Sequence, residues 1–173
     1  MIEYIKNRKS VRVYTEQKVS KEDIHTILEA GMSGPTACNK RPWSFIVVED
    51  KEMIGKMATC NGRFAEPLRR APLGILICAD LERDVEMAPG FWAVDCSIAA
   101  QNMVLAAEAL GLGSCWIGTW PAQSHVKNQQ ELFNLPDTII PHSILAIGYQ
   151  NDTVSKNKVK KIYEEDRVHF EKW

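Results

Sequence analysis

The amino-acid sequence predicts an α/β protein in which helices cover both faces of a central β-sheet. Four short apolar segments are typical of strands, and longer segments with helical periodicity separate them. We expect the strands at residues 44–49, 71–80, 112–118 and 142–149. Two of these segments are apolar at nearly every position, which indicates strands that are covered on both faces. The alternation of strands and helices along the chain predicts a layered sandwich.

The composition is that of a soluble globular protein. The length of 173 residues suits a single domain with a sizeable core. Apolar residues make up 45% of the chain and charged residues 25%, and the formal net charge of -1 lacks the basic excess of a nucleic-acid-binding protein. No segment approaches the ~20 apolar residues that span a bilayer, and the N-terminus shows no signal-peptide pattern. We therefore expect a cytoplasmic protein that binds neither nucleic acid nor a membrane.

The cysteines and histidines predict neither disulfides nor a metal site. The five cysteines are odd in number, scattered and without a C-x-x-C pair, so we expect reduced thiols. Cys78 and Cys115 lie in apolar segments, where a thiol behaves as a small core side chain. The four histidines have no ligand spacing with one another or with the cysteines, and we expect no bound metal.

A short helix is expected at residues 2–7, and a cationic segment follows it. Alternation in an extended chain places Arg8, Ser10 and Arg12 on one side. Guanidinium groups bind phosphate oxygens in a bidentate manner, and a hydroxyl adds one more donor. The segment therefore suits a phosphate group, although a solvated surface is the commoner interpretation of a charge run.

A helix with a hydroxyl cap at Ser20 leads into a loop at residues 34–43. Two prolines, a glycine and small polar residues prevent this loop from continuing the helix. The loop opens into the strand at 44–49 and is therefore held rigidly, so that its backbone amides and short side chains could face a ligand. On composition alone, an ordinary helix-to-strand connection is the simpler interpretation.

The middle of the chain contains the longest predicted helix. Asp50 caps a short helix before residues 59–70, which are polar and basic and are expected to be irregular. After the strand at 71–80 and a connection at 81–91, the helix at residues 92–110 is apolar most of the way round. Such a helix is buried in a core or against a partner.

The C-terminal part combines a helix at 124–133, the fourth strand and a charged tail at 150–173. The tail carries aromatic side chains at Tyr163, Phe170 and Trp173, and a tail of this composition is poorly ordered alone. Because its aromatic side chains need a surface that covers them, we expect the tail to pack on a neighbouring subunit.

Five segments, in order along nearly the whole chain, together resemble one family. They are Arg8 to Tyr14 (RKSVRVY), Gly34 to Trp43 (GPTACNKRPW), Gln101-Asn102 with Leu110 to Gly118 (LGLGSCWIG), Pro141 to Tyr149, and Tyr163 to Trp173. In this pattern the sequence is similar to the FMN-dependent nitroreductases in their short form. Two positions depart from the pattern, since Thr36 stands where serine is common and Arg41 stands where glutamine is common.

This resemblance implies a three-layer sandwich around a mixed sheet of four to five strands, in one FMN-binding domain that spans residues 1–173. It also implies a homodimer with FMN at the subunit interface and with the tail at 150–173 exchanged onto the partner subunit. The implied activity is that of an NAD(P)H-dependent oxidoreductase with a ping-pong mechanism. Hydride passes from NAD(P)H through flavin N5 to a nitroaromatic, a quinone or a related electrophile, so no catalytic side chain and no metal are implied.

The resemblance further implies which residues hold a tightly bound FMN. The phosphate is assigned to Arg8, Lys9, Ser10, Arg12, Lys158, Lys160 and Lys161, where Lys9 either uses its backbone or faces solvent. The loop that the partner subunit lays along the flavin ring is assigned to Pro35, Thr36, Ala37 and Asn39. The backbone amide that faces flavin N5 is assigned to the strand end at Ile117 and Gly118. Gln101 and Asn102 are interpreted instead as buried helix residues that satisfy backbone groups.

Three other interpretations are compatible with the same sequence. The first is an FMN-binding carrier or redox-sensing protein without efficient NAD(P)H turnover. The second is a cofactor-free dimeric binding module whose N-terminal cations contact an acidic partner. The third is a thiol enzyme built on Cys38, but no histidine is evidently paired with that cysteine.

Overall fold

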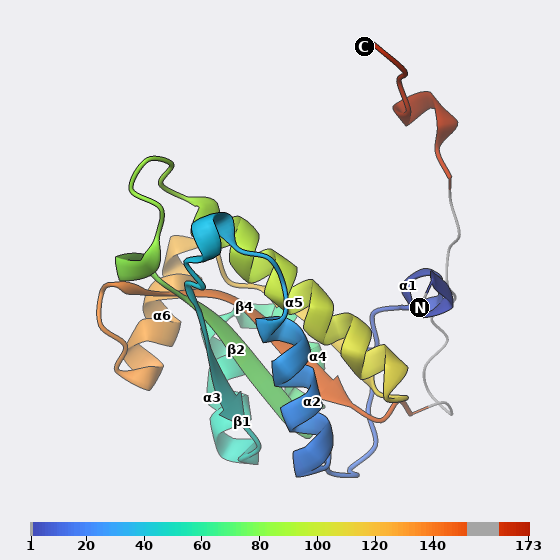
Figure 1. The fold of residues 1–173 in the computed structure, drawn as a ribbon. Helices are drawn as coiled ribbons and strands as arrows, with labels where there is room; N and C mark the ends of the chain where they lie inside the picture. The colour runs from blue at the N-terminus through green and yellow to red at the C-terminus, as the bar shows by residue number, and fades with distance from the viewer. Residues whose placement is uncertain (1, 152–162) are drawn as a thin grey trace.

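The computed structural model describes residues 2–151 and 163–173, in which helices cover both faces of one sheet (Figure 1). The strands are β1 (Trp43–Val48), β2 (Leu73–Asp80), β3 (Gly113–Gly118) and β4 (Ile139–Gly148), in the spatial order β1-β2-β4-β3. The helices are α1 (Ile2–Asn7), α2 (Lys21–Met32), α3 (Lys51–Cys60), α4 (Glu66–Arg69), α5 (Phe91–Ala109) and α6 (Gln123–Phe133). The four predicted strands and the three-layer sandwich are confirmed.

The three strand pairs of this sheet are all antiparallel, so the expectation of a mixed sheet is wrong in this respect. β2 and β3 run in the same direction, as two strands joined by a helical crossover do, but β4 lies between them and opposes both. The register of β2 against β4 shifts after Ile77, which pairs with Ser143, whereas the next residue pairs with Pro141. His142 therefore lies at an irregularity of β4, beside the end of β3.

α2 and α5 pack on each other over one face of the sheet (Figure 1). The side chain of Ser20 caps α2 by accepting the Asp23 amide at 3.0 Å, as the sequence predicts. The two helices approach closely at Gly31, where an added Cβ would lie 2.7 Å from Cγ of Met103. This close contact fixes the long helix α5 across the sheet.

α3, α4 and α6 cover the opposite face of the sheet. The side chain of Asp50 caps α3 by accepting the Met53 amide at 2.8 Å, which confirms the predicted cap. The prediction that residues 59–70 are irregular is wrong, because they contain a short 3-10 turn and α4. A helix forms there because Pro67 suits a first helical turn and Leu68 is completely buried in the core.

The segment after α1 lies along β3, the edge strand of the sheet. Ser10 forms a parallel bridge with Ser114, and the Val11 amide donates to the Ser114 carbonyl at 2.8 Å. Gly113 permits this approach, since an added Cβ would lie 2.6 Å from Cγ2 of Val11. The cationic segment is therefore fixed beside the strand that ends at Gly118.

Apolar side chains are exposed along α5 and in the C-terminal segment. Phe91 and Val94 of α5 are 47% and 51% exposed. In the segment at 163–173, Phe170 and Trp173 are 82% and 100% exposed. The expected exchange of the tail onto a partner subunit stays a prediction. Within the described ranges, no helix combines the length and the apolar character needed to cross a membrane.

Candidate functional site

Arg8 and Ser10, two of the predicted phosphate-binding residues, lie at one cavity of about 310 Å³. The cavity is lined by Arg8, Ser10, Gln101, Val104, Ser114 and Trp116. Three elements form it, namely the segment after α1, the helix α5 and the edge strand β3. A guanidinium, two hydroxyls and an amide side chain thus border a common space, and this set of donors suits a phosphate group.

Of the other predicted phosphate-binding residues, those that the structure describes do not line this cavity. Arg12 is exposed, and its Nη1 donates to the carbonyl of Ser10 at 3.2 Å. Lys9 is half-buried beside the cavity-lining residues but does not itself line the cavity. Outside the described residues lie Lys158, Lys160 and Lys161. The assignment of these side chains to a phosphate stays a prediction.

The outer edge of β3 continues from the cavity to the predicted flavin-facing residues. The Ser114 carbonyl accepts a hydrogen bond from the N-terminal segment, whereas the Thr119 amide donates to the His142 carbonyl at 3.1 Å. Backbone groups alternate in direction along a strand. Ser114, Trp116 and Gly118 therefore all direct their backbone groups away from β4, toward the side on which the cationic segment lies.

The packing of the described chain does not require glycine at position 118. Among the described residues, an added Cβ would meet only the Trp120 carbonyl oxygen, at 3.9 Å. The φ angle of Gly118 also lies outside the left-handed region that favours glycine. Space beside this backbone is therefore available to a bound group. The preceding residue, Ile117, is buried and pairs with Ile144 of β4.

The loop before β1, the second predicted flavin segment, is tied to α5. The Ala37 amide donates to both carboxylate oxygens of Asp95, at 3.0 and 3.2 Å. Thr36 Oγ1 accepts the Arg41 amide at 3.1 Å, and Asn39 Oδ1 accepts Nε of Arg41 at 3.0 Å. Asn39 therefore hydrogen-bonds locally, and Arg41 is held inside the loop.

This loop also has an uncommon backbone conformation. Cys38, Asn39 and Arg41 have φ angles of 49°, 54° and 50°, the left-handed region that is unfavourable for residues with a side chain. Such conformations persist where surrounding hydrogen bonds over-determine them, and they cluster at ligand sites. Pro35 and Cys38 are exposed, while Thr36 is half-buried. The loop therefore presents an exposed and fixed backbone.

Asp95 is a site residue that the sequence reasoning missed. It is 3% exposed on a helix whose other residues are mostly apolar. Burial raises the pKa of its carboxyl, the hydrogen bond from Ala37 opposes this shift, and the charge of Asp84 adds to it. The sequence did contain one signal for it, a single carboxylate on a helix that is otherwise mostly apolar. A buried carboxylate needs a hydrogen-bond donor, and the backbone amides of the loop at residues 34–43 can supply one.

The loop and the cavity lie on different sides of α5. The loop meets the helix at Asp95, whereas the cavity is lined by Gln101 and Val104. At about 100° per residue, the nine residues from Asp95 to Val104 turn the side chain about 180° around the helix axis. The described chain therefore does not bring its two predicted flavin segments into one pocket.

The two polar residues in the middle of α5 have different environments. Asn102 is half-buried, and its Nδ2 donates to the Ala30 carbonyl at 3.2 Å, which confirms its interpretation as a residue that satisfies backbone. Gln101 is exposed and lines the cavity, so the same interpretation is wrong for this residue. Adjacent side chains on a helix are about 100° apart around its axis. Asn102 therefore faces α2, whereas Gln101 faces the N-terminal segment.

Aromatic side chains surround the end of β3 near Gly118. The rings of Trp92 and Trp120 lie edge to face with centroids 4.9 Å apart. Trp92 and Trp116 both lie near the His142 ring, at 6.3 and 6.1 Å between centroids. Trp92 is buried, as expected for a core residue, whereas Trp116 and Trp120 are 37% and 36% exposed. Two half-exposed indoles therefore flank the candidate glycine.

His142 supports this aromatic cluster as a neutral side chain. Its Nε2 lies 3.2 Å from Ser97 Oγ, which donates its own proton to the Ala93 carbonyl at 2.7 Å. Nε2 therefore carries the ring proton, and Nδ1, 3.0 Å from Ser143 Oγ, is the acceptor. Burial lowers the pKa of His142 to about 4. The sequence gives this histidine no role, and the contacts are those of a satisfied structural residue.

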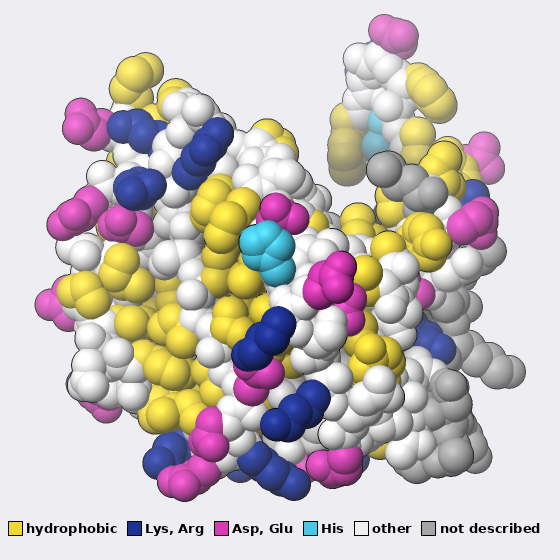
Figure 2. All heavy atoms as spheres, turned by 60° about the horizontal axis from the view of Figure 1, so that its bottom comes forward, with side chains coloured by type: hydrophobic (Ala, Val, Ile, Leu, Met, Phe, Trp, Pro, Cys, Tyr) yellow, Lys and Arg dark blue, Asp and Glu magenta, His cyan; other side chains and the backbone are white. Residues whose placement is uncertain are grey.

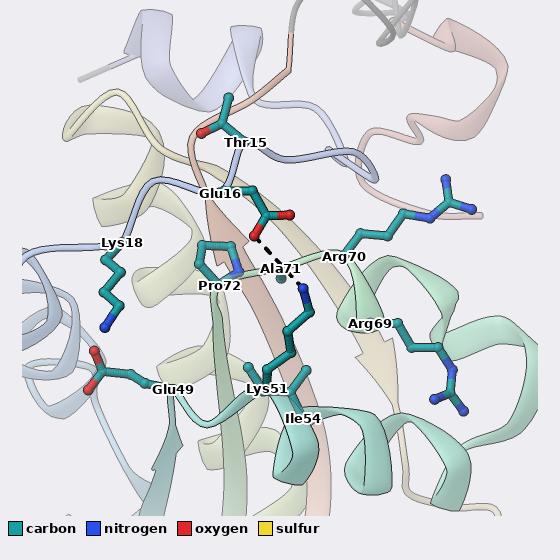
Figure 3. A pocket seen from close by; sticks show the side chains of 10 residues that line it. All are labelled: Thr15, Glu16, Lys18, Glu49, Lys51, Ile54, Arg69, Arg70, Ala71 and Pro72. Carbon is teal, nitrogen blue, oxygen red and sulfur yellow. Dashed lines mark ion pairs between the residues drawn. The ribbon is translucent and has the colours of Figure 1, made fainter.

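A second cavity, of about 170 Å³, lies before the start of β2 and has mixed charges in its wall (Figure 3). Lys51 Nζ lies 3.9 Å from a carboxylate oxygen of Glu16. Arg70 and Arg69 both pair with Glu66, at 3.3 and 3.7 Å, and Figure 3 shows their guanidinium groups directed away from the centre of the cavity. Because its cations face nearby acids, this cavity is a weaker phosphate site than the first.

Charged side chains are dispersed on the face of the molecule in Figure 2. Lysines and arginines alternate there with aspartates and glutamates, and hydrophobic side chains lie between them. That face carries no field of a single sign that would attract a nucleic acid. In the described part of the chain, no three His, Cys, Asp or Glu side chains form a group that could hold a metal ion.

Sequence comparisons with known proteins point to one family. The sequence model of the nitroreductase family matches residues 5–60 and 60–149. A Methanothermobacter thermautotrophicus protein, provisionally named NADH dehydrogenase/NAD(P)H nitroreductase, is 40% identical over 100% of this chain and 87% of its own. A Bacillus subtilis protein named FMN reductase (NAD(P)H) is 32% identical, over 90% of this chain and 68% of its own.

Solved structures show the same similarity at the level of the fold. The FMN-dependent nitroreductase of Clostridium difficile R20291 superposes with a TM-score of 0.90 and 33% identity, over 100% of both chains. The Bacillus subtilis nitroreductase NfrA1 superposes with a TM-score of 0.84 and 26% identity, over 98% of this chain and 73% of its own. A sequence match over most of the chain and a fold match over all of it lead to one conclusion: the chain belongs to the nitroreductase family.

Proposed function

We propose that the chain is a single-domain, FMN-dependent oxidoreductase that takes hydride from NAD(P)H and transfers it to an electrophilic organic acceptor. The observation that carries this proposal is the line of groups along the outer edge of β3. The donors of Arg8 and Ser10 lie at its start, and Gly118, whose Cα has open space beside it, lies at its end. Relatives named for FMN and NAD(P)H support the same assignment.

The residues at the start of this edge suit the FMN phosphate. A dianion needs cations and hydrogen-bond donors, and Arg8, Ser10 and Ser114 border one cavity. Arg12 reaches the same segment through the Ser10 carbonyl and would add a second positive charge. In this proposal Lys9 contributes at the rim of the site, together with the tail residues Lys158, Lys160 and Lys161.

The residues at the end of the edge suit the flavin ring. A backbone amide that is directed away from the sheet, on a residue without Cβ, permits a planar ring to approach closely. Ile117 would hold this amide in place, since its side chain is anchored in the core. Trp116 and Trp120 leave part of their ring surfaces exposed beside Gly118, which suits a planar nitroaromatic, quinone or related electrophile.

The proposal includes a homodimer with FMN at the subunit interface. Because the loop with Pro35, Thr36, Ala37 and Asn39 lies on the side of α5 away from the cavity, it would serve the FMN of the partner subunit. The exposed apolar side chains of α5 supply a surface for this contact. The exposed aromatic residues at 163–173 would be covered by the partner in the same way.

FMN, when bound, supplies reversible two-electron chemistry, so that reduction by NAD(P)H and oxidation by the acceptor occur as separate half-reactions at one site. The side chains of this chain then have to bind FMN, orient its reaction partners and exclude water. None of them has to act as an acid, a base or a nucleophile. This division of work explains why the neutral His142 and the exposed Cys38 are left without a catalytic task.

The test is an absorption spectrum of the purified protein, followed by anaerobic addition of NADH and, separately, NADPH. Flavin bands that bleach with either nucleotide and return with a nitroaromatic or a quinone are the expected result. Flavin bands that persist would instead indicate a carrier or a redox-sensing protein. A colourless protein that does not take up added FMN would overturn the proposal.

A further inference from the structure

Two buried amide side chains form a continuous hydrogen-bonded connection to the end of β3. Gln129 of α6 is completely buried, and Asn61 at the end of α3 is 1% exposed. Gln129 Nε2 donates to Asn61 Oδ1 at 2.8 Å. Asn61 Nδ2 in turn donates to the Gly118 carbonyl and to Thr119 Oγ1, both at 3.0 Å. The connection thus joins three elements and ends on the candidate flavin-facing glycine.

The directions of these hydrogen bonds are determined by their acceptors. Gln129 Nε2 also donates to the Met57 carbonyl at 2.8 Å, so a reversed amide would place its oxygen against two acceptors. Asn61 faces two acceptors with its nitrogen and one donor with its oxygen, so it too has a single favourable orientation. Buried polar groups that are connected in this way specify one local arrangement.

The arrangement that they specify is the peptide unit that follows Gly118. Its carbonyl oxygen is bound by Asn61, and its amide, on Thr119, is bound by the His142 carbonyl at 3.1 Å. Both ends of this peptide are therefore fixed. The amide of Gly118 itself belongs to the preceding peptide, which the pairing of Ile117 with Ile144 holds on β4. Because a glycine has the widest backbone freedom of any residue, fixing the following peptide restrains the remaining torsion of Gly118 and keeps the strand end that carries this amide in place.

We propose that Asn61, supported by Gln129, is a positioning residue that orients the backbone amide of Gly118 toward bound FMN. This inference rests on the proposed function. It assigns a role to a residue from the segment at 59–70, which none of the sequence motifs includes. Asn61 touches the backbone of the site and acts on the cofactor only through Gly118.

The role predicts a selective effect on the two redox states of FMN. In oxidised flavin N5 is only an acceptor, whereas in the reduced ring N5 carries a proton, so an ordered amide donor favours the oxidised form. Asn61→Ala is expected to weaken binding of oxidised FMN at least fivefold more than binding of reduced FMN. The ratio of the two dissociation constants follows from titration of the apoprotein with oxidised FMN and from the midpoint potential of the bound flavin.

A matched control is available on the same pair of helices. Asn128 Nδ2 donates to the Cys60 carbonyl at 3.3 Å, so it also ties α6 to the end of α3 but does not contact Gly118. Asn128→Ala is expected to leave the ratio of the dissociation constants within twofold of the wild-type ratio. Gln129→Met, which keeps the side-chain volume and removes the donor to Asn61, is expected to change the ratio in the same direction as Asn61→Ala.

The outcomes separate this inference from the function on which it rests. A wild-type protein that takes up no FMN overturns the proposed function, and the inference with it. If the wild-type protein binds FMN and Asn61→Ala weakens both redox states equally, Asn61 is only a structural residue and the inference is overturned. If Asn61→Ala does not fold, the ratio of the dissociation constants for oxidised and reduced FMN is measured in Gln129→Met instead. A ratio in Gln129→Met that equals the wild-type ratio overturns the inference.

Discussion

The carboxylate of Asp95 accepts the amide of Ala37 through both of its oxygens, at 3.0 and 3.2 Å. Through this contact a buried charge on the longest helix fixes a loop whose backbone is partly left-handed. The loop is therefore tied to the core beneath it, although its residues are largely exposed. A preorganised loop of this kind binds a ligand without the cost of ordering on association.

Asp95→Ala is expected to lower the free energy of unfolding by about 1–3 kcal/mol, because the Ala37 amide loses a charged acceptor. Asp95→Asn retains one acceptor oxygen and is expected to have a smaller effect. Chemical denaturation of the two variants measures the difference. Equal losses in both variants would mean that the loop is stabilised by the negative charge of Asp95, because a neutral acceptor of the same volume would not replace it.

Arg8→Ala is expected to weaken FMN binding by about 1.5–3 kcal/mol, since the guanidinium borders the proposed phosphate cavity. Arg12→Ala is expected to weaken binding less, because Arg12 does not line the cavity. Titration of the apoprotein with FMN measures both changes, and Lys127→Ala, which removes an exposed charge from α6, is the control. An unchanged affinity in Arg8→Ala would refute the placement of the phosphate.

Gly118→Ala is expected to impair FMN binding without a loss of stability, whereas Gly113→Ala is expected to reduce the stability of the protein. At position 118 the new Cβ meets only a carbonyl oxygen at 3.9 Å within the described chain, so the apoprotein should retain its stability while FMN binding falls at least tenfold. At position 113 the Cβ would lie 2.6 Å from Val11, and such overpacking costs about 1–3 kcal/mol of stability. Thermal unfolding of the apoproteins, together with FMN titration, separates the two cases.

The stability of the fold is expected to decrease on mild acidification because of His142. Its pKa is lowered from 6.5 to about 4 in the folded protein, so the unfolded state binds the extra proton first as the pH falls. The folded state is therefore favoured fully above about pH 6.5 and loses up to about 3 kcal/mol as the pH falls to 4. Denaturation at several pH values measures this slope, and His142→Gln should show a shallower slope than the wild-type protein.

Val94→Lys is expected to convert a dimer into monomers and to reduce FMN retention. Val94 is 51% exposed on α5, and a lysine there would introduce a charge into the proposed contact surface. Light scattering gives the molecular mass and an absorption spectrum gives the bound flavin. A wild-type protein that is monomeric while it carries FMN would contradict the proposed interface.

Most of the fold follows from local patterns in the sequence. The caps at Ser20 and Asp50, and the apolar strand segments, depend on residues close together in the chain, and all were predicted. The relative direction of the strands was not predicted. It depends on the position of β4 between β2 and β3, and this position results from contacts between residues far apart in the sequence. Residues 59–70 became partly helical through the burial of Leu68, a tertiary effect that their polar composition hides.

The site was predictable only where a motif marks it. Arg8 and Ser10 do meet at a cavity, and the loop that contains Ala37 is fixed by its hydrogen bonds to Asp95. Asp95 and Asn61 were missed, since each is a single polar residue whose partner is remote in sequence. Gln101 was misassigned because helical periodicity gives the direction of a side chain but does not show which element, if any, packs over it.

The position of β4 has a consequence for how the chain acquires its structure during synthesis. Among the strands of the described residues, β4 is the last to leave the ribosome, yet it lies inside the sheet between β2 and β3. Until residues 139–148 emerge, both strands expose an unpaired edge, and edges of this kind promote association between chains. The nascent chain therefore exposes two unpaired strand edges until β4 has been made, and a fragment released before β4 is synthesised would be prone to aggregate.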